Sequence, residues 1–169
     1  EDSEGERFWR HLDLDVARVG LPPTIVVSVR WHARSATVVR DRYPGASLLA
    51  VTDDLPFAVD GVLVDGQVLV GNVTALAPSA PGAARMVCVE CACHGLLWTA
   101  DLLMGNGNDG LVRPPASWFD SAAERAWLAD ELPGFLQSAM SPDIRIVVPA
   151  HGEPVTSDCR DALDRACSV

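Results

Sequence analysis

The sequence is poor in features that mark whole classes of protein. No apolar stretch approaches the roughly 20 residues of a membrane-spanning helix, and no signal-peptide pattern is visible. The 13 basic residues are outnumbered by 23 acidic ones, for a net charge of −10, and they form no cluster. Because nucleic acids and anionic membranes attract basic patches, we expect a chain that binds neither.

Other absences favour an ordinary globular domain. There is no internal repeat or low-complexity segment, and 49% of the 169 residues are hydrophobic. Length and composition favour a single domain covering residues 1–169. Five cysteines are an odd number without the spacing of a disulfide scaffold, so we expect reduced thiols and a cytoplasmic protein. The sequence starts at Glu1 rather than methionine, and we expect that residues were removed or that a longer product exists.

Three stretches share one pattern, a buried strand followed by polar residues. Residues 24–36 run from β-branched residues into Arg-Trp-His-Ala-Arg-Ser, residues 96–101 end at Asp101, and residues 144–153 carry His151 after an apolar run. Open α/β sheets place their ligand sites at the carboxyl ends of strands. We therefore predict that the three strand ends converge on one pocket.

The other elements follow from periodicity and turn signals. After a frayed lead-in, apolar spacing and capping residues predict helices at 8–19, 35–43, 121–140 (interrupted at Pro133-Gly134) and from 157 onward. Further strands are predicted at 46–51, within 59–76 around a hairpin turn at Asp65-Gly66, and as a hairpin of 85–92 with 96–100. The glycine-rich loop 105–110, which contains Asn106, is either a lid or wall of the pocket or a plain surface connection.

The order of elements and the three strand-end loops resemble the metallo-β-lactamase superfamily, from about Phe8 to the C-terminus. In that family the loops read Thr-His-x-His-x-Asp-His, Gly-His-Thr-Pro-Gly, Thr-Gly-Asp and Gly-His-Gly, and together they hold one or two zinc ions. The resemblance implies an α/β fold, an αββα sandwich. The strands that precede the first loop in the family are absent from this chain, so the domain is expected to be incomplete at its N-terminus.

Most of the family's zinc ligands are replaced here. Asp101 in Trp-Thr-Ala-Asp matches the bridging aspartate, and His151 in Pro-Ala-His-Gly matches the last histidine. The other five ligand positions carry Val29, Trp31, Ala33, Arg34 and Ser79. Val, Trp and Ala offer no metal ligand, and Arg offers none while it is protonated. His32 falls on a spacer position, so the resemblance gives it no ligand role.

The resemblance therefore implies a pocket without zinc. Because a buried carboxylate needs a positive partner, we expect the Arg34 guanidinium to pair with Asp101, with His151 close by. Trp31 and Trp118 would form an apolar wall. The pocket is expected to be lined by Ser28, which replaces the family threonine, and by Arg30, Trp31, His32, Arg34, Ser79 and Asn106.

One further cluster of ligand-type residues stands outside this pocket. Cys91, Cys93 and His94 lie at the predicted hairpin turn, at the end of the strand remote from Asp101, and they lack a fourth ligand nearby. We therefore expect no metal there. Nucleophilic catalysis by a serine of the pocket loops finds little support, because no Gly-x-Ser-x-Gly elbow is present.

Three functional interpretations remain. The leading one is a non-hydrolytic or metal-poor member with a degenerate zinc site, which binds a small molecule or a protein partner. The alternative is a hydrolase that uses Asp101 and His151 with one loosely held metal. The third is a structural subunit of a larger assembly. Because the missing strands would leave a sheet edge unpaired, we also expect a homo-oligomer or pairing with a separate N-terminal segment.

Overall fold

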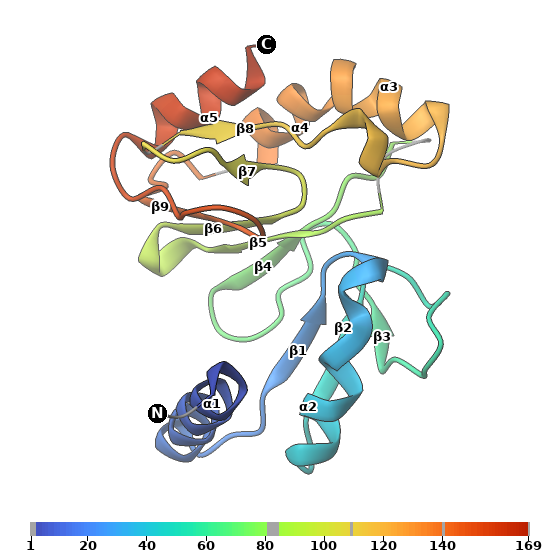
Figure 1. The fold of residues 1–169 in the computed structure, drawn as a ribbon, viewed down its shortest axis with the longest axis vertical. Coiled ribbons are helices and arrows are strands. Elements are labelled where there is room, and N and C mark those ends of the chain that lie inside the picture. Colours follow the sequence, from blue (N-terminus) through green and yellow to red (C-terminus); the bar gives the residue numbers. More distant parts are fainter. Residues whose placement is uncertain (1–2, 81–84, 109, 140, 169) are drawn as a thin grey trace.

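The computed structural model describes residues 3–80, 85–108, 110–139 and 141–168, and these form four layers (Figure 1). Two sheets face each other in the middle of the molecule, and helices cover the outer face of each sheet. The fold is therefore the αββα sandwich that the sequence predicted.

The first sheet is small and parallel. Its order is β1-β2-β3, and β1 and β2 are joined through a helix as the predicted βαβ unit. Side chains on its outer face pack against Ala33 and Ala36, which hold the segment after β1 in place. The elements of this half are α1 (Glu4–Val19), β1 (Thr24–Val27), the 3₁₀ helix η1 (Arg30–Ser35), α2 (Ala36–Arg42), β2 (Ser47–Ala50) and β3 (Gly61–Val62).

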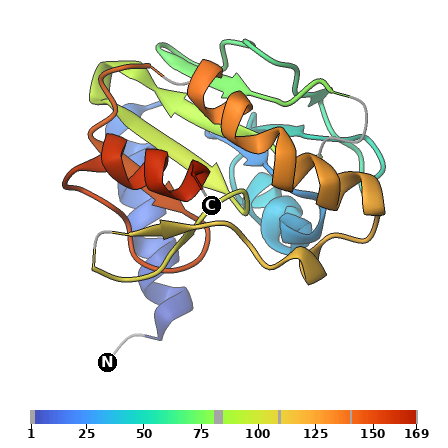
Figure 2. The same cartoon turned by 90° about the horizontal axis from the view of Figure 1, so that it is seen from above.

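The second sheet is mixed, with the order β4-β5-β6-β9. The first three strands form an antiparallel meander, and β9 runs parallel to β6. Three helices cross its outer face (Figure 2) and enclose the largest apolar cluster, which includes Leu97 and Val147 from the strands and Leu136 and Leu163 from the helices. Strands β7 (Met104–Gly105) and β8 (Leu111–Val112) pair only with each other, as a separate antiparallel two-stranded sheet among the described residues. The other elements of this half are β4 (Val73–Leu76), β5 (Cys88–Cys91), η2 (Ala92–His94), β6 (Leu96–Ala100), η3 (Ala116–Trp118), α3 (Ala122–Asp130), α4 (Leu132–Ala139), β9 (Ile146–Pro149) and α5 (Cys159–Cys167).

The inner faces of the two sheets share a separate apolar cluster. Val26 and Leu49 from the first sheet pack with Val89 of the second sheet and with Val87, which directly precedes β5, around Leu63. This contact fixes the two sheets relative to each other. The carboxyl ends of β1, β6 and β9 can therefore present side chains to one place.

Two predictions about local structure are corrected. The turn at Asp65-Gly66 is tight, with φ of +72° at Gly66, but it carries the chain from one sheet to the other. The hairpin turn lies instead around Gly71, where the Val73 N–H donates to the Val70 carbonyl at 3.0 Å. The reason is that β3 pairs with the parallel strand β2 rather than with the next strand along the chain.

The first helix also differs from its prediction at one end. It begins at Glu4, whereas the sequence predicted a frayed segment before a helix starting at residue 8. The reason is a capping box, in which the side chains of Ser3 and Glu6 each accept a hydrogen bond from the other residue's backbone N–H. It ends at Gly20, in a left-handed conformation, as predicted. Helix α1 buries none of its side chains, and Phe8 and Leu14 are each more than half exposed.

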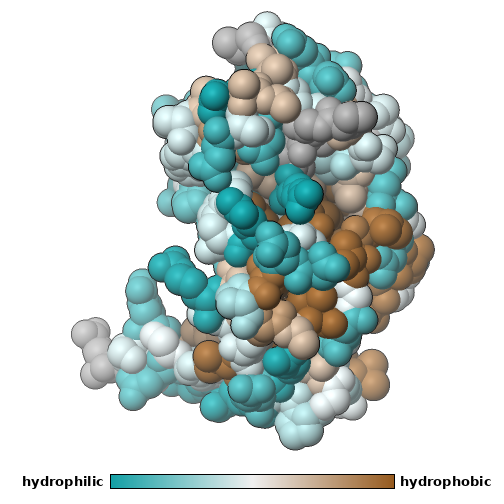
Figure 3. Space-filling model, turned by 90° about the vertical axis from the view of Figure 1, so that its right-hand side faces the viewer, coloured by the Kyte–Doolittle hydropathy of each residue, from teal (hydrophilic) through white to brown (hydrophobic). Residues whose placement is uncertain are grey.

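Apolar surface is unevenly distributed over the molecule. The side presented in Figure 3 has hydrophobic residues gathered around the middle, with hydrophilic surface above and below. A groove of about 730 Å³ lies between α1 and the two sheets, and it is lined by Val16, Val19, Val26, Leu69 and Trp98 among others. Within the described ranges, no helix has the length and apolar character needed to cross a membrane.

Candidate metal centre

Asp101 follows β6, and an irregular backbone turns its side chain inward. The pairing of β6 with β9 shifts register between Trp98 and Ala100, as in a β-bulge. Ala100 then has φ of +49°, a left-handed conformation that costs an alanine roughly 1–2 kcal/mol. The positive φ explains why glycine suits this position, where the Thr-Gly-Asp motif of the metallo-β-lactamase superfamily has glycine and this chain has alanine. Asp101 is fully buried as a result.

The two carboxylate oxygens of Asp101 have different surroundings. Oδ2 accepts a 2.8 Å hydrogen bond from Nε1 of Trp31, and Nε2 of His32 lies 3.4 Å from the same oxygen. Oδ1 is buried and accepts no hydrogen bond from the residues that the structure describes, while Nε2 of His151 lies 3.5 Å away. A buried carboxylate oxygen without a donor is costly. Oδ1 is thus available to coordinate a cation.

These distances fit a shared cation better than direct hydrogen bonds. Both His–Asp separations exceed the usual 2.7–3.2 Å range of N–H···O hydrogen bonds. Ligands about 2.1 Å from a tetrahedral zinc lie about 3.4 Å from each other. One ligand atom from each of His32, Asp101 and His151 lies within 4.8 Å of the other two. Two imidazoles and a carboxylate are also a ligand set that zinc accepts, so the residues present fit a divalent metal.

The 3₁₀ helix η1 explains how two neighbouring residues reach one carboxylate. The His32 N–H donates to the Val29 carbonyl at 3.1 Å, which closes a tight turn directly after β1. The same turn directs Ala33 into the apolar cluster under α2, while Val29 itself is fully buried in the main core. Trp31 and His32 are left to face Asp101. The residues at the first and third family ligand positions in this loop are therefore core residues here.

His151 is held by a close backbone approach. The N–H of Gly105, in β7, donates to the His151 carbonyl at 2.8 Å. A Cβ at Gly105 would collide with the backbone of Glu153, and a Cβ at Gly152 would collide with the Gly105 carbonyl. Two glycines are thus required where the β7 strand crosses the loop after β9. This crossing fixes the loop on which His151 stands.

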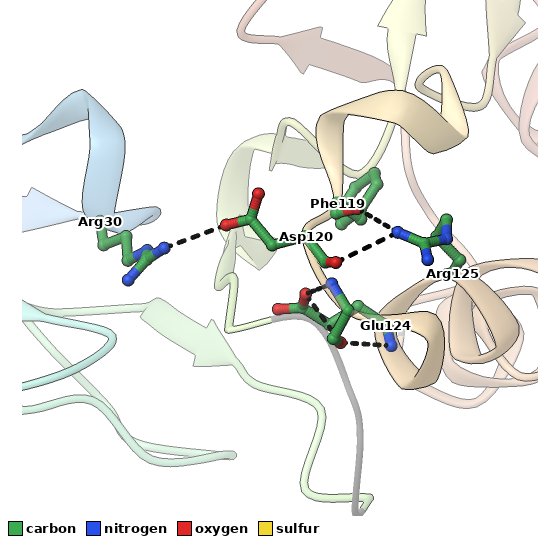
Figure 4. A network of polar contacts seen from close by, with 6 residues as sticks. Arg30, Phe119, Asp120, Glu124 and Arg125 are labelled. Atoms are coloured by element: carbon green, nitrogen blue, oxygen red, sulfur yellow. Dashed lines mark hydrogen bonds and ion pairs between the residues drawn. The ribbon is translucent and has the colours of Figure 1, made fainter.

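Aromatic and ionic contacts surround the cluster. Trp118 packs edge-on against His151, with ring centroids 5.2 Å apart. Arg30 pairs with Asp120 at 3.2 Å across the two halves of the molecule (Figure 4). Behind this pair, Arg125 donates to the backbone carbonyl of Asp120, and Ser121 and Glu124 form the predicted capping box of α3. The loop that carries Trp118 is therefore tied both to α3 and to η1.

The other residues predicted for the pocket lie apart from Asp101. The predicted Arg34–Asp101 ion pair is wrong: in the part of the chain that the structure describes, the contacts of Asp101 are Trp31, His32 and His151, and Arg34 is exposed. Ser28 is buried, and its carbonyl accepts from Val87. Ser79 is exposed in a hollow beside α4, and the backbone N–H of Asn106 donates to the Gly110 carbonyl at 3.1 Å within its own loop.

Sequence reasoning missed the part that His32 plays in this geometry. It placed His32 on a spacer because the family motif was read residue by residue, whereas the 3₁₀ turn brings His32 to the carboxylate of Asp101. A signal was present, because His32 is the single imidazole in that loop. The structure brings together Trp31, His32, Asp101 and His151 from the set that was predicted.

Comparison with known proteins identifies the fold. No protein-family model and no curated protein sequence matches this chain. The DIM-1 metallo-β-lactamase structure is similar, with a TM-score of 0.65 and 16% identity over 95% of this chain and 76% of that one. A metallo-β-lactamase from Pontibacter korlensis has a TM-score of 0.63 and 14% identity over 98% and 77%. The metallo-β-lactamase FIM-1 from Pseudomonas aeruginosa, in its mono-zinc form, has a TM-score of 0.57 and 11% identity over 84% and 64%.

These likenesses show that the chain has the metallo-β-lactamase fold, as the strand-end loops had indicated. Sequence identities of 11–16% support the assignment of the fold, but not of an activity or a substrate. What the site does has to be argued from its own residues.

Proposed function

We propose that this chain is a hydrolase in which His32, Asp101 and His151 hold a single zinc ion. The observation that supports this most directly is the buried Oδ1 of Asp101, which has no hydrogen-bond donor among the described residues. Nε2 of His151 lies 3.5 Å from Oδ1, and Nε2 of His32 lies 3.4 Å from Oδ2 of the same carboxylate. A site with three protein ligands leaves one position open, as catalytic zinc sites do. The similar FIM-1 enzyme has a mono-zinc form, so one zinc is compatible with this fold. When bound, zinc supplies Lewis acidity and an activated water near neutral pH.

The neighbouring residues have defined tasks in this proposal. Trp31 donates to Oδ2 of Asp101, which orients the carboxylate and leaves Oδ1 for the metal. Gly105 fixes the loop of His151 from behind. Trp118 covers one edge of the His151 ring, and together with Trp31 it limits the access of water and offers an apolar surface to a substrate.

The surroundings favour a substrate that carries an anionic group. Trp31 also lines a hollow of about 270 Å³, together with Arg30, Arg34 and Phe57 among others. Arg30 is partly neutralised by Asp120. Within the described ranges, Arg34 has no carboxylate partner, so its guanidinium is free to pair with a carboxylate or phosphate of a ligand.

A second candidate is the metal-free binding protein that the sequence favoured. It is supported by the 2.8 Å bond from Trp31 to Asp101, which already satisfies one oxygen without a metal. If either imidazole were protonated, it would balance the remaining charge. In that case the pocket would bind a small molecule or a partner without hydrolysis. We keep a cytoplasmic location as part of both candidates, on the strength of the unpaired thiols expected from the sequence.

Zinc binding to the reduced chain separates the two candidates. We would measure it in a Cys91→Ser/Cys93→Ser background, so that thiolates contribute nothing, with His32→Ala and His151→Ala as test variants. The hydrolase proposal expects one zinc per chain and a loss of affinity of at least about 100-fold in each variant, because each removes one of three ligands. His11→Ala, an exposed histidine on α1, is the matched control and should bind normally.

Activity completes the test. The zinc-loaded chain should hydrolyse at least one member of a panel of esters, thioesters and lactams that carry a carboxylate, and the corresponding methyl esters should be poorer substrates. A folded chain that takes up no zinc, or His32→Ala and His151→Ala variants that bind it as tightly as His11→Ala, would instead favour the metal-free binding protein.

A further inference from the structure

The turn between β5 and β6 carries a second group of metal-type ligands. Sγ of Cys91 and Sγ of Cys93 are 3.5 Å apart, and one ligand atom from each of Cys91, Cys93 and His94 lies within 4.8 Å of the other two. The three residues come from the end of β5 and from η2. Both cysteines carry free thiols, and within the described ranges neither sulfur bonds to a side chain outside the turn.

This group is separate from the Asp101 centre. Asp101 follows the far end of β6, and the five residues of that strand span roughly 17 Å at 3.3 Å per residue. No single ion can bridge that distance. The sequence had predicted this separation, and from it and the missing fourth ligand it had expected no metal at the turn.

The geometry of the turn suits a metal that binds sulfur. Two thiolates bound about 2.3 Å from one zinc ion and separated by 3.5 Å subtend an angle of about 99°, which is close to tetrahedral. Cys93 and His94 are exposed, so an ion can reach them from solvent.

The turn is also held in place by its neighbours. Gly95 has φ of +60°, and a Cβ there would lie 2.5 Å from the Asp143 carbonyl. The Gly95 carbonyl accepts from the N–H groups of Arg145 at 2.7 Å and Ile146 at 3.0 Å. The ligands therefore stand on a turn that is docked against the start of β9. Little ordering would be needed when an ion binds.

We propose that Cys91, Cys93 and His94 form a binding site for a thiophilic d¹⁰ cation, Zn²⁺ or Cu⁺. Two thiolates and an imidazole are ligands that both ions accept. With three protein ligands in the described residues, Cu⁺ would be three-coordinate and Zn²⁺ would add a solvent molecule. Because the site closes the β5–β6 turn, an ion bound there stabilises the folded chain by mass action.

The test uses the reduced chain carrying His32→Ala and His151→Ala, so that the Asp101 centre is disabled. Titration with Co²⁺ should give the near-ultraviolet absorption of thiolate-to-cobalt charge transfer, saturating at one equivalent. Cys91→Ser/Cys93→Ser should abolish this absorption, and His94→Ala should weaken binding by at least about 10-fold. His11→Ala is the control and should titrate unchanged.

Displacement of the bound Co²⁺ by Zn²⁺, and competition of a Cu⁺-specific chelator with the chain, then identify the preferred ion. Either preference supports the proposal. At about a hundred times the dissociation constant, the melting temperature should rise by roughly 5–10 °C. Absence of the charge-transfer absorption in a folded, reduced chain overturns the proposal. So does an unchanged titration in Cys91→Ser/Cys93→Ser, or formation of a Cys91–Cys93 disulfide in place of any metal complex.

Discussion

The side chain of Asp101 is fully buried, and few polar contacts replace the hydration that its carboxylate has lost. Among the described residues, its carboxylate accepts one hydrogen bond, from the indole N–H of Trp31, and the nitrogens of both nearby imidazoles lie 3.4–3.5 Å from its oxygens. Leaving a carboxylate buried and unpaired costs several kcal/mol. A residue kept at that cost, at the end of a bulged strand, is best explained by a ligand that completes its surroundings.

The indole of Trp31 should therefore tune metal affinity without being a ligand. Trp31→Phe keeps an aromatic ring and removes the donor to Oδ2, so the carboxylate loses its orienting bond. We expect zinc to bind about 10–100-fold more weakly, as is usual when a partner of a metal ligand is lost. Competition with a chromogenic chelator measures this. Trp118→Phe, which removes an indole N–H that makes no bond to Asp101, is the control, and equal affinities in the two variants would contradict the prediction.

The five thiols should differ sharply in reactivity. Burial raises the pKa of the Cys88 thiol to about 12, so it stays protonated and unreactive at pH 8. Cys93 is exposed and Cys91 is partly exposed, so these two should be alkylated first. Peptide mass spectrometry after a short iodoacetamide pulse checks the order.

Thiol titration of the denatured, unreduced chain tests the expected redox state. The structure contains no disulfide among the described residues, and recovery of five groups would agree with it. Recovery of three or one would show that the chain forms disulfides and would remove the argument for a reducing compartment.

At the scale of elements, the crossing of β7 over the loop after β9 controls the position of His151. Gly105→Ala would place a methyl group against the Glu153 backbone, so the loop must shift and His151 must move with it. We expect a marked loss of zinc affinity together with lower stability. Gly107→Ala lies in the same loop, where a Cβ meets nothing within 4 Å, so it should keep zinc binding and show only the roughly 1 kcal/mol cost of a positive φ. Isothermal titration calorimetry and urea unfolding separate the two effects.

The contact between α1 and α2 should make stability depend on acid pH. Hydrogen bonds from Arg42 and then Tyr43 lower the pKa of Asp13 to about 2, from an ordinary value of about 3.9. Because the folded-state pKa is depressed, this contribution is complete above pH 4 and is lost as the pH falls toward 2. Asp13→Asn should flatten the loss of stability in that window in urea unfolding. Asp15→Asn, on the same helix, should leave it unchanged.

At the scale of the whole molecule, one side of the sandwich is open. Helix α1 buries no side chain, β1 is an edge strand among the described residues, and an apolar groove of about 730 Å³ runs between them. Exposed edges and apolar grooves tend to be covered. The expectation of self-association or of pairing with an N-terminal segment stays a prediction, and the groove gives it a location.

We expect a second copy of the chain to cover this surface at micromolar concentration. Val19 lines the groove and is 61% exposed, so Val19→Glu should shift a dimer to monomer in light scattering. Val38→Glu, on a similarly exposed position of α2 outside the groove, should remain dimeric. A monodisperse monomer of the unmodified chain would contradict the prediction.

The sequence by itself determined the order of elements and the three strand ends that carry the site. Local signals were sufficient for this: β-branched runs for the strands, the Ser121–Glu124 capping box for α3, and Gly20 for the end of α1. It also placed Asp101 and His151 just after buried strands, and the structure brings the two side chains to 3.5 Å from each other.

Only the tertiary structure decided what completes the site. Counting motif positions assigned the positive partner of Asp101 to Arg34, but a 3₁₀ turn brings Trp31 and His32 to the carboxylate and leaves Arg34 exposed. The same holds for the β5–β6 turn, where residues two apart in sequence bring their sulfur atoms to 3.5 Å. The spacing of residues along the sequence does not give the backbone conformation of these short turns. That conformation depends on how η1 and η2 pack in the folded chain.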